Sequence, residues 1–297
     1  MTTTGVRGLI VFQAVEIGDE RSFGFRPQRG SLHAVAHVER LTLDERRRVW
    51  VLEDLRDAFL HVPLQRLLQV IGKFLPAADL IGLIERVLSG NELSGLRQGG
   101  PLSPLLLNLY LHHFLDRPWR RDQPRLPLVR VADDLLVLCR TETEARQAHG
   151  ELIRRLRPSG MPLKETVDSA IHELTAGTSA SWLGFSFLKP RRGLAIGIEE
   201  RSWDELAQRL AFAHSTDRAA QLANQIVHGW LGQKGPCYLG SDRDEVCRRI
   251  TAIAGEQAFD EIPGTAELKG LWQRAYARWC RLRIPSQARR GQPNNGT

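Results

Sequence analysis

The first part of the chain alternates short apolar runs with longer stretches of helical periodicity. Residues 49–54 are rich in β-forming side chains and predict a strand. Apolar positions recur every three to four residues from Val62 to Leu75, which predicts a helix after that strand. A loop rich in Gly and Pro follows at residues 96–104.

The segment after this loop predicts a buried helix. Ser103 can serve as its N-cap and Pro104 suits its first position. The residues that follow, to about Asp116, are apolar nearly all round. Because a helix of this kind has no polar face to offer to water, we expect neighbouring elements to cover it.

Two strand pairs are predicted farther along. Residues 128–139 read as strand, tight turn, strand, with Asp133 and Asp134 in the turn. Residues 182–187 and 194–198 predict a second hairpin with a basic loop between its strands.

Helices dominate the rest of the chain. A helix is predicted at residues 142–156, and after Trp203 the pattern contains helices only. This change predicts a domain boundary close to residue 200. Residues 286–297 are polar and basic, and we expect them to be disordered.

Composition leaves two explanations of the charge open. Of the 297 residues 42% are hydrophobic, so the chain can bury a sizeable core. The formal net charge is +7, and only five of the 41 basic residues are lysines. Arginine suits bidentate contacts with phosphate, which favours a polyanionic partner, but an arginine-rich genome would give the same composition.

The cysteines and apolar stretches indicate a cytoplasmic protein. Four cysteines without a Cys-x-x-Cys pair are too few to staple a chain of this length, so we expect reduced thiols and no structural zinc. The longest apolar stretch is interrupted by Asn108, His112 and His113, and no export signal is recognisable. The sequence predicts no membrane span.

The acidic pair Asp133-Asp134 lies between two short apolar runs. Such a pair is often no more than a solvated hairpin tip. Here the flanking runs are apolar enough to be core strands, and a third acid, Asp54, ends another such strand. Carboxylates gathered at strand ends repel one another unless cations are present, and oxygen-rich sites suit Mg²⁺. Two such ions would support nucleotidyl transfer, which on spacing alone is one hypothesis among several.

Three motifs occur in one order: Asp54-Leu55-Arg56-Asp57-Ala58-Phe59, then Leu96-Arg97-Gln98-Gly99-Gly100-Pro101-Leu102-Ser103-Pro104, then Ala132-Asp133-Asp134. In this order they resemble the motifs of the reverse transcriptases, in particular those encoded by group II introns. The resemblance implies that Asp54, Asp133 and Asp134 are the catalytic, metal-binding acids, with Asp133 the principal ligand. It also implies a cofactor of two Mg²⁺ ions, for which Mn²⁺ can substitute.

The resemblance assigns further residues to nucleotide and template binding. Phe59 holds the bulky position that excludes ribonucleotides, and Gln98 and Gly99 belong to the second motif. Lys164, within Gly160-Met161-Pro162-Leu163-Lys164-Glu165-Thr166, corresponds to a lysine near the incoming triphosphate. Arg26 lies in Ser22-Phe23-Gly24-Phe25-Arg26-Pro27, which matches a segment that closes the fingers, and Arg29 follows it.

Each of these residues has a second explanation from the sequence alone. Phe59 could be a core aromatic, and Gln98 and Gly99 could form a plain loop before a helix. Arginines are more often solvated than bound to phosphate, and a lysine is as often a surface residue as a triphosphate ligand.

Two later segments extend the resemblance. Trp182-Leu183-Gly184-Phe185 resembles the primer-grip hairpin. The segment from Leu222 to Trp230, with Asn224 and Gly229, resembles a helix of the thumb or maturase region that grips template and intron RNA in relatives. Trp230 taken alone is more typical of a core residue. One departure is Val131, which stands where the family has a tyrosine before the acidic pair.

The fold implied is α+β with the right-hand polymerase architecture. It comprises partial fingers at residues 1–48, a palm at 49–200 built on a small antiparallel sheet flanked by helices, an α-helical thumb at 201–285 and a disordered tail at 286–297. The implied activity is RNA-directed DNA polymerisation, with an RNA template, a DNA primer and dNTPs as partners, and structured intron RNA as a further partner.

Alternatives to an active polymerase stay open. Relatives carry a basic fingers hairpin with the sequence R-P-L-G-I-P upstream of the part that begins here at about Val6, so the fingers would be minimal or supplied by another polypeptide. The chain could instead be a maturase-like RNA-binding splicing cofactor that does not polymerise, or an inactive, N-terminally truncated fragment. No Cys/His-rich endonuclease module is recognisable, which predicts no DNA cleavage.

Overall fold

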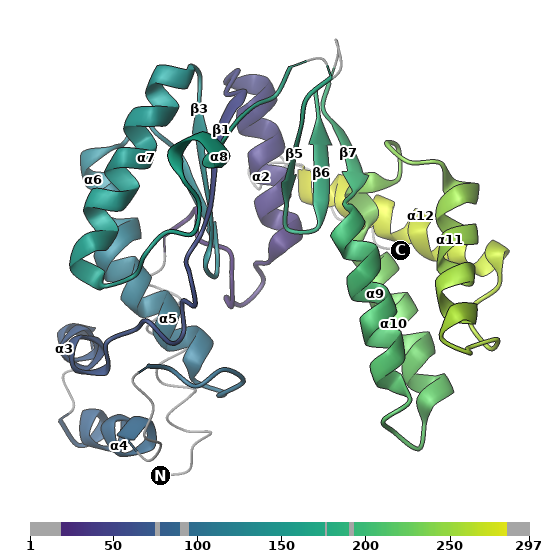
Figure 1. Ribbon diagram of the computed structural model, residues 1–297, viewed down its shortest axis with the longest axis horizontal. Helices are drawn as coiled ribbons and strands as arrows, with labels where there is room; N and C mark the ends of the chain where they lie inside the picture. Colours follow the sequence, from purple (N-terminus) through teal and green to yellow (C-terminus); the bar gives the residue numbers. More distant parts are fainter. Residues whose placement is uncertain (1–18, 75–77, 90–94, 176, 190–192, 284–297) are drawn as a thin grey trace, which may run out of the picture. The chain divides into compact units, whose positions relative to one another are not determined.

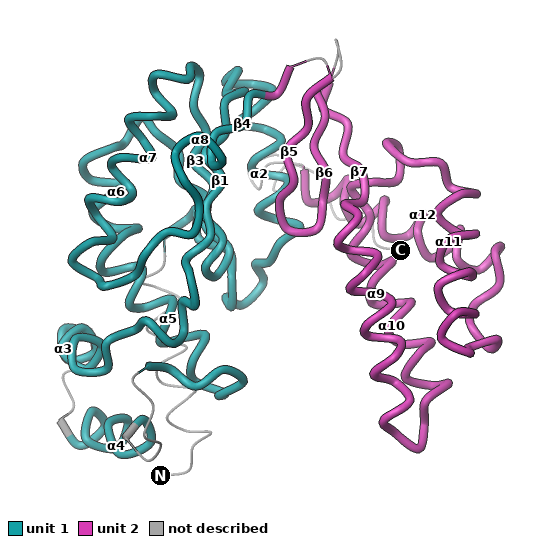
Figure 2. The backbone as a smooth tube through the Cα atoms, in the orientation of Figure 1, with its two compact units in different colours: residues 1–173 teal, residues 174–297 magenta. Residues whose placement is uncertain are grey.

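The computed structural model of the chain describes residues 19–74, 78–89, 95–175, 177–189 and 193–283 (Figure 1). They belong to two compact units, residues 1–173 and residues 174–297 (Figure 2). Small antiparallel sheets and helices make up both units, so the predicted α+β class is confirmed. The tail predicted to be disordered lies outside the described residues. Among the described residues, no helix is long and apolar enough to cross a membrane.

Unit 1 contains a four-stranded antiparallel sheet in the order β2-β3-β1-β4. Its two central strands pair continuously, from Val49 opposite Cys139 to Asp54 opposite Asp134. The predicted strand at residues 49–54 is confirmed. The strands are β1 (Val49–Asp54), β2 (Leu128–Val131), β3 (Asp134–Cys139) and β4 (Ile171–Glu173).

The helix predicted at residues 142–156 is confirmed, and the one predicted from Val62 to Leu75 is present as Leu64–Phe74. Thr141 caps the helix at residues 142–156 by accepting a hydrogen bond from the backbone N–H of Glu144. The α-helices are α2 (Ser31–Asp44), α3 (Leu64–Phe74), α4 (Ala78–Ser89), α5 (Ser103–Leu111), α6 (Arg117–Asp122), α7 (Glu142–Leu156) and α8 (Val167–Ala170). A π-helical turn, η1 (His112–Asp116), joins α5 to α6, and a 3-10 turn, η2 (Arg157–Ser159), follows α7.

Side chains on both faces of the sheet are buried. Along β1 every residue from Val49 to Glu53 is buried, which requires a covering layer on each side because successive side chains point to opposite faces. Val49 and Val51 belong to a core cluster with buried residues of α5 and α7. Trp50 and Leu52 point to the other face, where α2 contacts β2 and β3.

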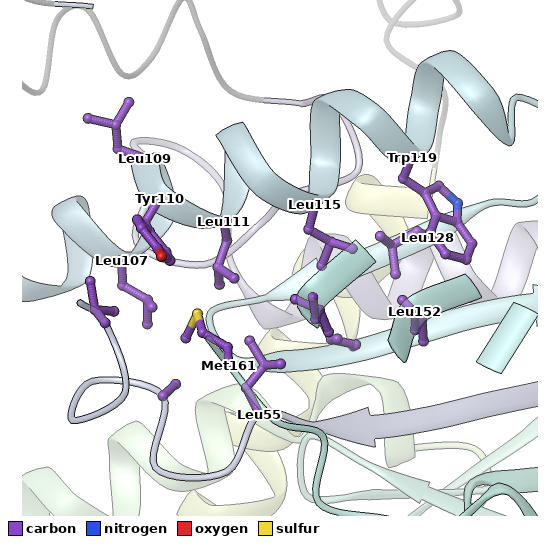
Figure 3. Packing of buried hydrophobic residues seen from close by; sticks show 14 of the residues in the cluster. Leu55, Leu107, Leu109, Tyr110, Leu111, Leu115, Trp119, Leu128, Leu152 and Met161 are labelled. Atoms are coloured by element: carbon purple, nitrogen blue, oxygen red, sulfur yellow. The ribbon is translucent and has the colours of Figure 1, made fainter. Parts of the chain in front are cut away.

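The helix formed by α5 and η1 is largely buried, as predicted, and in α6 Trp119 alone is buried (Figure 3). Tyr110, Leu115 and Trp119 from these successive segments are at most 1% exposed. The prediction that Ser103 is the N-cap was wrong. Leu102 holds that position, and the Ser103 hydroxyl instead donates to the carbonyl oxygen of Arg97 at 2.6 Å, which closes the preceding loop.

The turn of the first hairpin lies one residue earlier in the chain than predicted. β2 ends at Val131 and β3 begins at Asp134, so the two loop residues are Ala132 and Asp133 rather than the two acids. Ala132 has a φ of 59°, the left-handed backbone that short hairpin loops require.

Unit 2 consists of a three-stranded antiparallel sheet in the order β5-β6-β7, followed by helices. The second predicted hairpin is present as β6 and β7. The expectation of one strand over residues 182–187 was wrong, because the chain reverses at Leu183 and Gly184. The elements are β5 (Ser179–Trp182), β6 (Phe185–Leu188), β7 (Ala195–Ile198), α9 (Glu200–Ala213), α10 (Ala219–Gln233), the 3-10 turn η3 (Gly235–Cys237), α11 (Arg243–Glu256) and α12 (Thr265–Arg283).

Tryptophans hold the helices of unit 2 together. Trp203 of α9 packs against Trp230 of α10 with ring centroids 4.8 Å apart. Trp272 of α12 is fully buried and donates its indole N–H to the carbonyl oxygen of Lys234 at 2.7 Å. Aromatic side chains bury large apolar areas, so these contacts carry much of the unit's stability.

His37 of α2 is a buried titratable group in unit 1. Its Nε2 atom is buried without a hydrogen-bond partner, and its ring lies 5.8 Å from that of Phe23, measured between centroids. Burial, assisted by the charges of Arg40 and Arg21, lowers the pKa of His37 from 6.5 to about 4. The neutral form is therefore favoured in the folded state.

This pKa shift predicts acid sensitivity. Because the folded pKa of His37 lies below the unfolded value, the unfolded chain binds more protons between pH 6.5 and 4, and stability falls as the pH falls through this window. We expect wild type to lose about 3 kcal/mol more than His37→Gln between pH 7 and pH 4. Urea unfolding of both proteins at the two pH values measures the difference, and equal losses would contradict it.

Candidate active site

Asp54 and Asp134 face each other across the two central strands. Their Cα atoms are partners in the β1–β3 register. The amide N–H of Leu55 donates to the carbonyl oxygen of Asp133 at 3.3 Å, just beyond this pair. Asp54 and Asp134 are therefore a non-hydrogen-bonded pair, the type in which opposite side chains lie closest and on the same face. Both are partly buried.

Asp133 occupies the loop beside this pair. Burial raises the pKa of Asp133 above its ordinary value, and the negative charge of Asp54 raises it further, whereas Arg130 lowers it. The two carboxylates thus lie close enough for the charge of Asp54 to act on Asp133. That Asp133 is the principal metal ligand and Asp134 the weaker one stays a prediction.

Lys164 lies beside Asp54. Its ammonium Nζ is 3.4 Å from Asp54 Oδ2, and its backbone N–H donates to the Asp54 carbonyl oxygen at 3.0 Å. The side chains are 54% and 39% exposed, respectively, so the ion pair contributes little to stability. The sequence assigns Lys164 to the nucleotide, and the structure places it beside Asp54.

A buried pair anchors the segment that carries Lys164. Glu53 Oε1 and His149 Nε2 are 2.6 Å apart, with both side chains at most 5% exposed. The other carboxylate oxygen of Glu53 accepts from the backbone N–H of Glu165 at 3.2 Å. Burial raises the pKa of Glu53. Glu53 precedes Asp54 in β1 and also binds the backbone of Glu165, which follows Lys164. The Glu53–His149 pair therefore holds in place the backbone on both sides of the Asp54–Lys164 ion pair. This pair was not identified from the sequence.

The second motif joins the first through the backbone. Leu96 N–H donates to the carbonyl oxygen of Phe59 at 2.7 Å. Phe59 is partly buried and packs against the core cluster of unit 1. Gln98 and Gly99 are exposed, in the loop that the Ser103 hydroxyl closes, and Gly99 has a φ of 76°. The structure thus brings Phe59 close to the loop of Gln98.

Arg26 and Arg29, which were predicted to bind template or nucleotide, form hydrogen bonds with backbone carbonyl groups of their own loop. Arg26 donates to the carbonyl oxygens of Asp19 and Ser22 at 2.5 and 3.1 Å. Arg29 donates to the carbonyl oxygen of Glu20 at 2.6 Å. These contacts hold the loop before α2 in shape, and the assignment of both arginines to template or nucleotide stays a prediction.

The loop that they stabilise lies against the acidic hairpin. Phe23 N–H donates to the Arg130 carbonyl oxygen at 2.8 Å, and Arg130 N–H donates to the carbonyl oxygen of Arg21 at 2.9 Å. Gly24 is so close that a Cβ atom would overlap the backbone nitrogen of Ala132 and come within 3.0 Å of its Cα.

Unit 2 carries the segment that resembles the primer grip. Trp182 ends β5, Phe185 begins β6, and both are at most 5% exposed. Leu183 and Gly184 form the turn with φ values of 54° and 74°, as a two-residue hairpin loop of this type requires. The Gly184 carbonyl oxygen accepts from Lys234 Nζ at 3.2 Å, which ties the turn to the end of α10.

In α10, two of the three residues singled out in the sequence bind backbone of this chain. The Asn224 amide donates to the carbonyl oxygens of Ala220 and Glu261 at 3.0 and 2.7 Å. Trp230 is buried and donates to the carbonyl oxygen of Ser202 at 3.0 Å, which agrees with the core explanation. Gly229 is exposed, with open space around it.

The three acids are compatible with divalent cations, although they do not form a cage. In the described part of the chain, no group of three or more His, Cys, Asp and Glu side chains is arranged to hold a metal ion. The oxygen donors nevertheless suit Mg²⁺, and a cation would relieve the repulsion between Asp54 and Asp133.

Residues 9–187 match the model of a family described as reverse transcriptase (RNA-dependent DNA polymerase). The chain belongs to this family. The matched region includes all three acids and Lys164 of this reverse transcriptase.

The chain is also similar to individual proteins. The chain is 31% identical to Protein YkfC of Escherichia coli (strain K12) over 105 residues, which are 31% of this chain and 28% of YkfC. Its fold resembles apo telomerase from Candida tropicalis with a TM-score of 0.53 and 10% identity, covering 97% of this chain and 60% of that one. Telomerase from Candida albicans in complex with a TWJ fragment of telomeric RNA gives a TM-score of 0.49 and 10% identity, covering 92% and 56%.

The close approach of Gly24 to the acidic hairpin predicts intolerance of any side chain there. We expect Gly24→Ala to lower the free energy of unfolding by about 1–3 kcal/mol, because the added methyl must displace backbone atoms. Gly150→Ala is the control, since Gly150 lies in α7 with open space around it and should not lose stability. Urea denaturation compares the two, and equal stability of both variants would contradict the prediction.

Proposed function

We propose that this reverse transcriptase is an RNA-directed DNA polymerase of the group II intron or retroelement type. The observation that carries the proposal is the facing pair of Asp54 and Asp134 with Asp133 in the adjoining loop, at the end of a sheet buried on both faces. The proposed substrates are dNTPs, with an RNA template and a DNA primer as partners. The chain spans 60% of the telomerase chain, and its match covers 28% of YkfC.

Asp54 and Asp133 would hold Mg²⁺, or Mn²⁺ in its place, with Asp134 as the weaker ligand. When bound, two such ions supply charge neutralisation for the attacking 3′-hydroxyl and for the leaving pyrophosphate. The chain's own contribution is to keep anionic oxygens together against their mutual repulsion, and the packed strands β1 and β3 do this.

Lys164 would serve the incoming triphosphate. Its ion pair with Asp54 is exposed and therefore weak, so the ammonium group can turn to a phosphate without a large loss of energy. The Glu53–His149 pair keeps the backbone of the segment in place while the lysine side chain moves.

Phe59, Gln98 and Gly99 would form the side of the site that holds the nucleotide sugar and base. Two contacts support this grouping: the hydrogen bond between Leu96 and Phe59, and the closed loop that leaves Gln98 exposed. Packing of Phe59 against the core holds its ring in place, as steric exclusion of a ribose 2′-hydroxyl requires.

The division into fingers, palm and thumb is also a proposal. Residues 1–48 would be partial fingers with Arg26 and Arg29, residues 49–200 the palm, and residues 201–285 the thumb. The hairpin at Trp182 to Phe185 would be the primer grip. A structured intron RNA is the further partner proposed. The bonds of Asn224 and Trp230 to this chain's own backbone lend no support to RNA contacts by those two side chains.

The acids should be essential for DNA synthesis. We expect Asp54→Asn and Asp133→Asn to slow primer extension on an RNA template by about 10²–10⁴-fold, because each removes several kcal/mol of transition-state stabilisation. Asp168→Asn, at an exposed ion pair on α8, should extend the primer like wild type. RNA affinity should be nearly unchanged in all three variants.

The same experiment separates the alternatives. A splicing cofactor that does not polymerise would bind RNA and tolerate loss of the acids. If folded wild type binds RNA but does not extend the primer with Mg²⁺ or Mn²⁺, the polymerase proposal fails.

Phe59 should set sugar specificity. We expect Phe59→Val to lower the preference for dNTPs over rNTPs by about tenfold or more, because a smaller side chain leaves room for the 2′-hydroxyl. Phe59→Tyr keeps the bulk and should keep the preference. Single-nucleotide incorporation kinetics with dNTP and rNTP measure both variants, and an unchanged ratio in Phe59→Val would refute this role.

A further inference from the structure

We propose that Arg130 is a positioning residue that orients Asp133 by holding the peptide bond in front of it. Its side chain is fixed by a buried network with Asp116 and Asn108. This inference rests on the proposed polymerase function, because it assigns Asp133 a catalytic task. Sequence reasoning gave none of the three residues a role.

The network is buried and closely spaced. Arg130 Nε and Nη2 donate to the two carboxylate oxygens of Asp116 at 2.9 and 2.6 Å, a bidentate pair. Arg130 Nη1 donates to Asn108 Oδ1 at 2.8 Å and to the carbonyl oxygen of Ala132 at 2.8 Å. The residues Arg130, Asp116 and Asn108 are 1%, 5% and 8% exposed.

The bond to Ala132 acts on Asp133 through the peptide plane. The carbonyl oxygen of Ala132 and the amide nitrogen of Asp133 belong to one planar group, so a donor that fixes the oxygen also fixes the nitrogen. On the far side of Asp133, its own carbonyl oxygen accepts from Leu55 N–H at 3.3 Å. Both peptide groups that flank Asp133 are therefore held, and the direction in which its side chain leaves the backbone is set.

The loop needs such an anchor. It has only two residues, and the first, Ala132, is a non-glycine residue with a φ of 59°. A left-handed backbone at a residue with a Cβ atom is strained and persists only where the surroundings enforce it. The guanidinium of Arg130 supplies that constraint from inside the protein.

Asn108 extends the network to the segment before α2. Its amide oxygen accepts from Arg130, and its amide nitrogen donates to the carbonyl oxygen of Gly24 at 2.6 Å. Gly24 lies directly against Ala132. The hairpin loop is thus held by Arg130 from one direction and by the backbone of Gly24 from another.

Stability alone does not account for a buried ion pair at this place. Taking both charges out of water costs about as much as their attraction returns, and an apolar pair of similar volume is often as stable. What an apolar side chain cannot do is donate a hydrogen bond to Ala132. The geometry therefore points to orientation of the hairpin as the purpose of Arg130.

Arg47 offers a matched control. Its side chain is also buried, and it donates to the carbonyl oxygen of Leu138 at 3.1 Å, near the opposite end of β3 from Asp133. Its further partners are Glu45 and the Arg125 carbonyl oxygen. Arg47→Gln and Arg130→Gln thus each remove a buried guanidinium group, one bonded near the far end of β3 and the other bonded directly beside Asp133.

The test combines kinetics with amide hydrogen exchange at matched folded concentration. We expect Arg130→Gln to lower the single-turnover extension rate about 10- to 100-fold, because a small misplacement of the Asp133 carboxylate costs this much. The KM for dNTP and the Kd for primer–template should be nearly unchanged. Exchange should quicken in a peptide covering residues 131–135. Arg47→Gln should show neither effect, and Arg130→Lys should recover part of the rate because it keeps the charge beside Asp116.

A second variant covers the case in which Arg130→Gln does not fold. Arg130→Gln/Asp116→Asn leaves no unpaired buried charge, and it should show the same loss of rate. If either folded variant extends the primer like wild type, or if Arg47→Gln loses as much rate, the positioning role of Arg130 is wrong. If wild type itself does not extend the primer, the proposed function fails instead. In that case hydrogen exchange still tests the positioning role, and equal exchange rates at residues 131–135 in the Arg130 and Arg47 variants would refute it.

Discussion

The antiparallel pairing of β1 with β3 is the constraint on which unit 1 depends. Six residue pairs fix the register, and both faces of the two strands are buried. A shift by one residue would turn the apolar side chains of one strand to the wrong face. The acids at the end of these strands are therefore held by the packing of the sheet, since their own charges drive them apart.

Elements with strong local patterns could be predicted from the sequence. The strand at residues 49–54 and the helix at residues 142–156 have the predicted bounds, because the first is a compact β-rich run and the second has a capping Thr141. The reversal at Leu183 was missed, since the two-residue turn adds no polar break to an apolar run. The loop at Ala132 was placed one residue late, because an alanine with positive φ gives no sequence signal.

In the candidate site too, residues with a local sequence pattern could be predicted and residues that meet only through folding could not. The acids could be found because they interrupt apolar runs at strand ends, and the family motifs assign them a chemistry. The Arg130–Asp116–Asn108 network could not be assembled, because its members come from β2, η1 and α5 and meet only after folding. A signal was present nevertheless: an arginine in the middle of a core strand must have a buried partner.

The π-helical turn η1 sets the direction in which that partner, Asp116, leaves the helix. Each residue advances a helix by about 100°, so the extra residue in a π turn rotates everything after it by that amount. Without it, Asp116 would leave the helix in another direction and Arg130 would be buried without a counter-charge. The length of this helix and the charges at positions 116 and 130 therefore depend on one another: deleting one residue between Leu111 and Asp116 would turn the carboxylate away and leave the Arg130 guanidinium without its counter-charge.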